Sequence, residues 1–228
     1  PNMYKIAAEQ LPCVFHVSAR TVSTHALNIF GDHSDVMACR QTGFAMLCET
    51  NPQEVMDLSP VAHLAAIEGK VPFLNFFDGF RTSHEIQKIE VWSDEQLEAL
   101  LDRSAVDTFR YRGLSPNRPV LRGSAQNPDI FFQEREVANQ FYDTLPRVVE
   151  DYMNKINAMI GSNYHLFDYY GDPDAENIII AMGSVTETIK ETVDYLRAKG
   201  EKVGVITVHL YRPFSAKYLL NVLPKSVK

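Results

Sequence analysis

The chain has 228 residues, of which 45% are hydrophobic and 22% are charged. These shares are ordinary for a globular protein, so they exclude intrinsic disorder as the main state, and the length fits one or two domains. The net charge of -7 argues against a duplex nucleic-acid binder, which presents a basic face. No apolar run approaches the ~18 residues of a membrane-spanning helix, so we expect no membrane association.

Three cysteines, Cys13, Cys39 and Cys48, exclude a disulfide framework. They are also too few for a cysteine-only iron–sulfur cluster, which takes four thiolates. The chain opens without an initiator methionine or a signal peptide, and it closes at residues 223–228 directly after a short apolar segment. We therefore expect a piece of something longer; a processed mature protein is the alternative.

The first part of the chain predicts alternating strands and helices. Residues 13–19 are short, apolar and rich in β-branched side chains, as in a buried strand, and residues 44–48 form a second such run. Residues 51–54 (Asn-Pro-Gln-Glu) are typical of a helix start with a capping box, and Gly69 is expected to end that apolar helix. Residues 71–77 form the next strand. This order predicts a parallel α/β layer.

The middle of the chain is less regular. Residues 78–90 read as a polar loop, after which Ser93 is expected to cap an amphipathic helix. Residues 111–130 hold several glycines and prolines and predict an extended connector. We expect one long helix over residues 134–160 and a linker between domains over residues 161–176.

The clearest unit lies near the end. Residues 177–182 predict a strand, residues 184–187 (Ser-Val-Thr-Glu) a capping box that opens a helix, Gly200 the end of that helix, and residues 203–208 a return strand. One βαβ unit does not bury both faces of its sheet, so we expect a truncated second domain.

Polar residues that follow the predicted strands are the candidates for chemistry. Arg20 comes directly after the first strand, where α/β sheets bind ligands, and its guanidinium can grip a carboxylate with two bonds. Taken alone, one arginine favours a structural ion pair. Residues 31–35 (Gly-Asp-His-Ser-Asp) could form a metal or acid–base site, but local side-chain-to-backbone bonds are the favoured interpretation. For residues 78–85, a functional loop and a structural one remain equally open.

Other polar groups favour structural roles. Ser184 is expected to cap its helix, although a helix N-terminus can hold an anion. Cys39 and Cys48 are interpreted as structural thiols, and His16 as a hydrogen-bonded core histidine. The residues by themselves describe an α/β fragment and name no reaction.

Several longer blocks follow one another along nearly the whole chain, at residues 1–5 (PNMYK), 16–20 (HVSAR), 29–46 (IFGDHSDVMACRQTGFAM), 75–90 (NFFDGFRTSHEIQKIE), 123–129 (GSAQNPD) and 210–214 (LYRPF). Together these blocks resemble the pyruvate:ferredoxin (flavodoxin) oxidoreductase family. The resemblance implies an enzyme of roughly five times this length. It implies an incomplete thiamine diphosphate-binding domain of the pyrimidine type with a parallel sheet, at residues 1–172. A truncated α/β domain II that is similar to the transketolase C-terminal domain follows at residues 173–228.

The resemblance also implies an activity. Such enzymes oxidatively decarboxylate pyruvate to acetyl-CoA and carbon dioxide, and they reduce ferredoxin or flavodoxin. The implied cofactors are thiamine diphosphate, magnesium and [4Fe–4S] clusters, and the cofactors carry the hard chemistry. The implied partners are pyruvate, coenzyme A and the electron carrier, with a homodimer as the full-length assembly. The expected location is the cytoplasm, or an anaerobic organelle in a eukaryote.

For individual residues, the resemblance implies that Arg20 is a catalytic residue that binds the pyruvate carboxylate and that Ile29 lines the same pocket. It assigns no cofactor-binding or metal-ligating residue in this chain. The thiamine-activating glutamate is expected before Pro1, and the diphosphate–magnesium site and the cluster cysteines beyond Lys228, so the isolated chain is expected to be inactive. A non-catalytic remnant, a subunit-pairing scaffold and an oxidoreductase for another 2-oxoacid are the alternatives.

Overall fold

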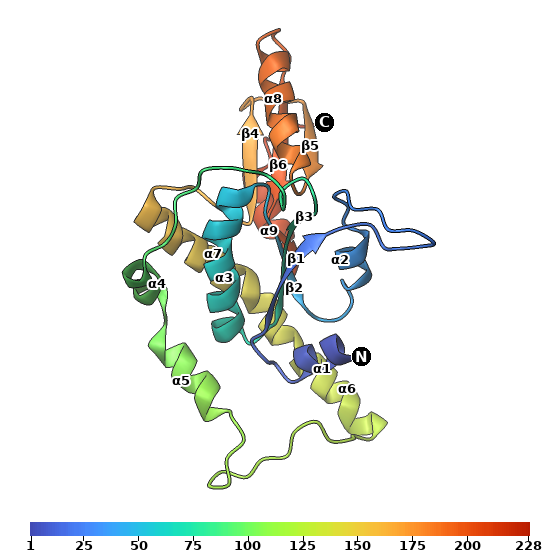
Figure 1. Ribbon diagram of the computed structural model, residues 1–228, viewed down its shortest axis with the longest axis vertical. Coiled ribbons are helices and arrows are strands. Elements are labelled where there is room, and N and C mark those ends of the chain that lie inside the picture. The colour runs from blue at the N-terminus through green and yellow to red at the C-terminus, as the bar shows by residue number, and fades with distance from the viewer.

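A computed structural model describes all 228 residues and contains two β-sheets with helices packed around them (Figure 1). The larger sheet has the strand order β1 (Val14–Ala19), β3 (Phe73–Asp78), β2 (Ala45–Cys48) and β7 (Leu210–Arg212). Strands β1, β3 and β2 run parallel, and β7 is antiparallel to β2. The expected mixed α/β architecture with a parallel sheet is therefore confirmed.

The smaller sheet has the order β4 (Phe167–Gly171), β6 (Val203–Val208) and β5 (Asn177–Ala181). β5 and β6 are parallel and are joined by α8 (Val185–Arg197), which confirms the predicted βαβ unit. β4 is antiparallel to β6 and lies within the expected linker at 161–176. This segment is therefore more than a linker, because Leu166 and Phe167 are buried in the core and β4 completes the sheet.

The remaining helices are α1 (Asn2–Ala8), α2 (Ser34–Ala38), α3 (Pro52–Gly69), α4 (Asp94–Leu100), α5 (Arg103–Tyr111), α6 (Pro128–Val137), α7 (Asn139–Ile160) and α9 (Ala216–Val222). The single helix expected over 134–160 is two helices that meet at Ala138. α6 has no buried residue, whereas α7 has seven. The connector between α5 and α6 loops away from the body, as expected for 111–130 (Figure 1). None of the helices combines the length and hydrophobicity that crossing a bilayer requires.

The start of α3 follows its sequence signature with one shift. Asn51 Oδ1 accepts a hydrogen bond from the Glu54 N–H at 3.0 Å, but the Glu54 carboxylate folds back to the N–H of Thr50, one residue beyond the cap. α3 ends at Gly69, as expected. The residue that follows, Lys70, takes the left-handed conformation, with φ of 56°. Gly69 lies against Leu145 of α7, where a Cβ would come within 2.4 Å of Leu145 Cδ1.

One core of 21 buried residues joins the two sheets, with α3 and α7 packed together at its centre. It takes residues from β2, β3, β4, β6 and β7, including Leu47, Phe73, Phe167, Ile206 and Leu210. β1 lies at the sheet edge, and Phe15 is 37% exposed, so the fully buried strand expected at 13–19 was wrong. The three parallel strands end on the same side of this core, which is where the candidate site lies.

Candidate functional site

The carboxyl ends of β1, β3 and β2 form one edge of the larger sheet. Arg20 follows β1, Gly79 follows β3, and Glu49 and Thr50 follow β2. Residues far apart in the chain therefore meet here, as is common for ligand sites in open α/β sheets.

The Arg20 side chain is held in place without an ionic partner. Its backbone N–H donates to Asp35 Oδ2 at 2.9 Å, and Arg20 forms an isolated antiparallel bridge with Gly31. The side chain crosses Gly79, because a Cβ at Gly79 would come within 2.5 Å of Arg20 Cγ. Arg20 takes part in no ion pair, and its Nε is buried without a hydrogen-bond partner. The structural ion pair that the residue alone favoured is absent.

Ile29 lies in the loop that returns from β1 to Gly31. Its side chain is 42% exposed, and the ring of its neighbour Phe30 packs edge-on against Phe80 at a centroid distance of 4.8 Å. The bridge between Arg20 and Gly31 brings the end of this loop back beside Arg20. The loop thus presents apolar side chains on the arginine side of the edge.

Asp78, the last residue of β3, is the hub of this edge. Its Oδ1 lies 2.6 Å from His33 Nε2, and its Oδ2 accepts from the Ser184 N–H at 2.9 Å and from the Ser184 hydroxyl at 2.5 Å. The capping box expected at 184–187 was wrong, because the Ser184 hydroxyl binds Asp78 instead of capping its own helix. The carboxylate thereby ties β3 to the first turn of α8, where the helix dipole favours a negative charge.

Two glycines make room for this contact. A Cβ at Gly31 would lie 3.0 Å from Asp78 Cβ. Gly183 has φ of +82°, and a Cβ there would lie 2.9 Å from Asp78 Oδ1 and 3.0 Å from the His33 ring. Gly183 therefore needs to be glycine, whereas a side chain at Gly31 would require Asp78 to shift.

The hydrogen bonds decide the charge of Asp78. Burial by itself would raise the pKa of this carboxyl, but the hydrogen bonds from His33 and Ser184 together outweigh burial, so the pKa lies below its ordinary value of 3.8. Asp78 is therefore ionised at neutral pH. Sequence analysis missed this pairing, because His33 and Asp78 are 45 residues apart.

A polar cavity of about 670 Å³ opens between this edge and α8. Its lining includes Gly31 and Asp78, which neighbour Arg20 in space, together with Thr50, Arg81 and Glu187. The Thr50 hydroxyl donates to Glu187 Oε1 at 3.3 Å and closes one side. Of residues 78–85, Asp78, Arg81 and Glu85 line this cavity, so that loop faces the site.

Glu49 lies behind the edge and is buried without a hydrogen-bond partner for either oxygen. Burial, and secondly the charge of Glu54, raise its pKa well above the ordinary value.

Close by, a buried histidine joins the two sheets. His209 Nδ1 lies 3.0 Å from the carbonyl oxygen of Cys48, and its Nε2 lies 3.0 Å from Asp168 Oδ2. Burial would lower the pKa of His209, but Glu54 and Asp168 raise it to about 9. The imidazolium therefore bonds a residue of β2 and a residue of β4 at once.

The other sequence candidates have local roles. Asp32 Oδ1 accepts from the Ser34 N–H at 2.6 Å, which confirms the local bond expected in residues 31–35. His16 is exposed and not a core residue, although it is hydrogen-bonded to His63 and Asn75. Cys48 is buried, whereas Cys39 is only half-buried. No group of three or more carboxylate, imidazole and thiol side chains is arranged to hold a metal ion.

The site geometry can now be compared with known proteins. Residues 1–154 match the family model described as pyruvate flavodoxin/ferredoxin oxidoreductase, thiamine diphosphate-binding, and residues 175–228 match pyruvate:ferredoxin oxidoreductase core domain II. The chain belongs to the pyruvate flavodoxin/ferredoxin oxidoreductase family. The family resemblance seen in the sequence blocks is therefore confirmed.

Several relatives match the entire chain. It is 67% identical to pyruvate-flavodoxin oxidoreductase of Enterobacter agglomerans over 100% of this chain and 19% of that protein. It is 65% identical to the protein of the same name from Klebsiella pneumoniae and 61% identical to pyruvate:ferredoxin oxidoreductase of Moorella thermoacetica, in both cases over 100% of this chain and 20% of the relative. The chain thus spans about a fifth of these family members.

A solved structure supports the fold. A chain of 2-oxoglutarate:ferredoxin oxidoreductase from Magnetococcus marinus, solved with 2-oxoglutarate, coenzyme A and succinyl-CoA bound, superimposes with a TM-score of 0.59 at 15% identity. The match covers 96% of this chain and 41% of that one. At this identity the likeness concerns the fold alone, and it agrees with a partial thiamine diphosphate-binding domain of the family.

Proposed function

We propose that this chain supplies part of the substrate pocket of an enzyme that oxidatively decarboxylates pyruvate to acetyl-CoA and carbon dioxide and passes the electrons to ferredoxin or flavodoxin. The observation that carries the proposal is Arg20: a half-buried guanidinium beside a strand end, with no carboxylate partner of its own. Family membership supports the reaction.

In this proposal, Arg20 grips the substrate carboxylate with its planar fork. Gly79 lets the arginine side chain cross the strand end, and Asp35 fixes its backbone. Ile29 supplies an apolar wall. One fixed cation beside an apolar wall suits a small 2-oxoacid. The apolar wall favours the loss of charge when carbon dioxide leaves.

The cofactors of the proposed reaction are thiamine diphosphate, magnesium and [4Fe–4S] clusters. When bound, thiamine diphosphate would provide the nucleophilic carbon for the decarboxylation, and the residues of this chain would bind and orient the substrate beside it. Magnesium and the clusters do not fit the residues of this chain, because no side-chain group is arranged to hold a metal and the three cysteines are too few. We therefore place these groups on other parts of the enzyme, and the isolated chain is expected to be inactive.

We also propose the larger assembly. Two domains, at residues 1–172 and 173–228, agree with the family models at 1–154 and 175–228, although β4 precedes this boundary and pairs with β6. The proposed partners are pyruvate, coenzyme A and the electron carrier, in a cytoplasmic homodimer.

Arg20 gives the direct test, in the complete enzyme that carries this chain. Arg20→Ala is expected to lower kcat/KM for pyruvate by about a hundredfold, because a charge-assisted bidentate contact is worth about 3 kcal/mol. Arg20→Lys keeps the charge and loses the fork, so we expect an intermediate value. Arg110→Gln, on the exposed face of α5, is the control. Pyruvate-dependent dye reduction measures the rates, and an unchanged kcat/KM in Arg20→Ala would refute the assignment.

A related reaction with another 2-oxoacid is the second candidate, because the arginine fork of Arg20 can bind the carboxylate of any 2-oxoacid. Comparing kcat/KM for pyruvate and 2-oxoglutarate in the same assay separates the two. No turnover with either substrate would instead support a subunit-pairing scaffold or a non-catalytic remnant.

A further inference from the structure

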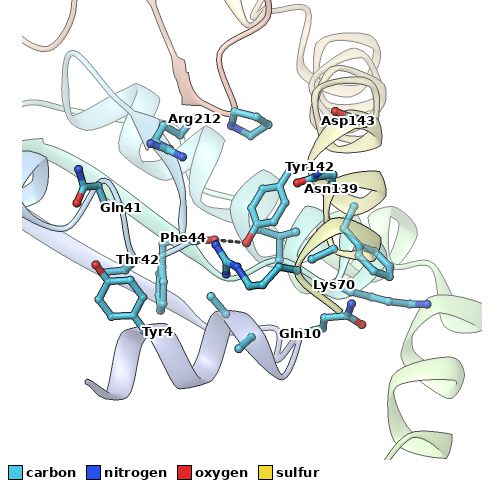
Figure 2. Close-up of a pocket in the computed structure, with 18 residues that line it drawn as sticks. Tyr4, Gln10, Gln41, Thr42, Phe44, Lys70, Asn139, Tyr142, Asp143 and Arg212 are labelled. Carbon is cyan, nitrogen blue, oxygen red and sulfur yellow. Dashed lines mark hydrogen bonds between the residues drawn. The ribbon is translucent and has the colours of Figure 1, made fainter. Parts of the chain in front are cut away.

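A second cavity, of about 310 Å³, lies at the opposite edge of the larger sheet (Figure 2). Its floor is formed by Phe44, which directly precedes β2, and by Val71, which lies two residues before β3. Its walls come from α1, from the junction of α6 and α7, and from Arg212 at the end of β7. Since β3 has six residues at about 3.3 Å each, this cavity is about 20 Å from Arg20.

The charges around this cavity are unusual for the chain. Lys70, Arg135 and Arg212 line it, and Asp143 is its one acidic residue. The cavity therefore has a formal charge of +2, although the whole chain has a net charge of -7. None of the three cations takes part in an ion pair or donates a hydrogen bond; Lys70 only lies 5.8 Å from the centre of the Phe141 ring.

Arg135 and Arg212 line this cavity together with Tyr142. Burial raises the pKa of Tyr142, and the charges of Arg135 and Arg212 oppose this rise. The Tyr142 hydroxyl donates to the carbonyl oxygen of Gly43 at 2.8 Å (Figure 2). Arg135 comes from α6 and Arg212 from the end of β7, so only the tertiary fold brings them together.

The backbone at the floor of the cavity is closely packed around Gly43. Gly43 has φ of +93°, and a Cβ there would lie 2.8 Å from Ala7 Cβ and 2.9 Å from the Tyr142 hydroxyl. Glycine is therefore required for α1 and α7 to approach the start of β2 this closely.

We propose that this cavity binds the phosphate group of a small phosphate monoester. A phosphate monoester carries a charge of about -1.5 to -2 at neutral pH, which matches the formal charge of the cavity, whereas a monocarboxylate matches half of it. Two arginine forks suit the phosphate oxygens, and the volume is at the lower end for small-molecule sites. Because the cavity lies at the far edge of the sheet from Arg20, the ligand binds outside the proposed substrate pocket.

The test titrates the full 228-residue chain with inorganic phosphate and with glycerol phosphate at constant ionic strength, by calorimetry. Arg135→Gln and Arg212→Gln are each expected to weaken both ligands by about tenfold or more. Arg110→Gln is the matched control, because Arg110 and Arg135 are both exposed and both lie in the last turn of a helix. The melting temperature without ligand reports whether each variant is folded.

Two results would overturn the proposal. The first is equal phosphate affinity in the native chain and in folded Arg135→Gln. The second is acetate binding as tightly as phosphate. That result would make the cavity a general carboxylate site, for example one that binds an acidic side chain from the remaining sequence of the longer relatives. Loss of phosphate binding in Arg135→Gln with retention in Arg110→Gln would support it.

Discussion

Asp78 shows how much one side chain decides at the carboxyl edge of the sheet. The carboxylate accepts hydrogen bonds from Ser184 and pairs with His33, and the absence of a Cβ at Gly31 and Gly183 makes room for it. Arg20 is next to this arrangement, since its side chain crosses Gly79. The proposed substrate arginine therefore lies beside a group of polar contacts that the sequence did not reveal.

Asp78→Asn is expected to lower the free energy of unfolding at pH 7 by about 2 kcal/mol or more, because hydrogen bonds to a buried charge are lost. Folding lowers the pKa of Asp78, so its contribution is present above the ordinary carboxyl pKa of 3.8 and is lost as the pH falls through the lowered pKa. The difference between the variant and the native chain should therefore shrink below pH 3.8. Urea unfolding at several pH values measures it, with exposed Asp107→Asn as the control. A difference that does not change with pH would contradict the ionised state.

Helices α3 and α7 pack against each other at the centre of the core. Both carry a proline inside, yet both remain continuous and pack closely. The close approach depends on Gly69, which is the last residue of α3, as the sequence suggested, and which also faces Leu145. Lys70 then takes the left-handed position that glycine usually occupies.

Gly69→Ala separates helix propensity from packing. Propensity alone would stabilise α3 by about 1 kcal/mol, but the added methyl group would collide with the fully buried Leu145, at a cost of about 1–3 kcal/mol. We expect net destabilisation in the native background. In a Leu145→Ala background the collision is gone, so Gly69→Ala should be neutral or stabilising there. Denaturant unfolding of the four proteins gives this cycle, and additive effects would show that the two residues do not interact.

At the scale of the whole molecule, the two sheets are joined by a shared hydrophobic core and by one buried charge cluster. Leu47 and Phe73 of the larger sheet share that core with Phe167 and Ile206 of the smaller sheet. His209 adds a polar connection, because it bonds Cys48 on one side and Asp168 on the other.

This connection predicts a loss of stability at alkaline pH. Folding raises the pKa of His209 from 6.5 to about 9, so its contribution is fully present below pH 6.5 and is lost as the pH rises through 9. The shift corresponds to about 3 kcal/mol. His209→Asn should be less stable at pH 7 and should show a flatter pH dependence between 6.5 and 9. Thermal unfolding at constant ionic strength measures both, with the exposed His25→Asn as the control. Parallel pH curves for native chain and His209→Asn would contradict the charged state.

The sequence by itself determined the α/β class, the parallel order of strands around α3, the βαβ unit at the end and the family. These features depend on local patterns: apolar runs, helix caps such as Asn51, and blocks of residues in order. Arg20 also stood out, because it directly follows a strand.

Only the tertiary structure decided which polar groups meet. Asp78 pairs with His33 and Ser184, and His209 bonds Cys48 and Asp168. These contacts, and the cations that line the second cavity, join residues distant in the chain, and no local pattern encodes them. β4 was missed for the same reason, since its neighbour β6 follows it by more than 30 residues and supplies the hydrogen bonds that make it a strand. The absence of an ionic partner for Arg20, which gives that residue its proposed role, is likewise a property of the folded chain.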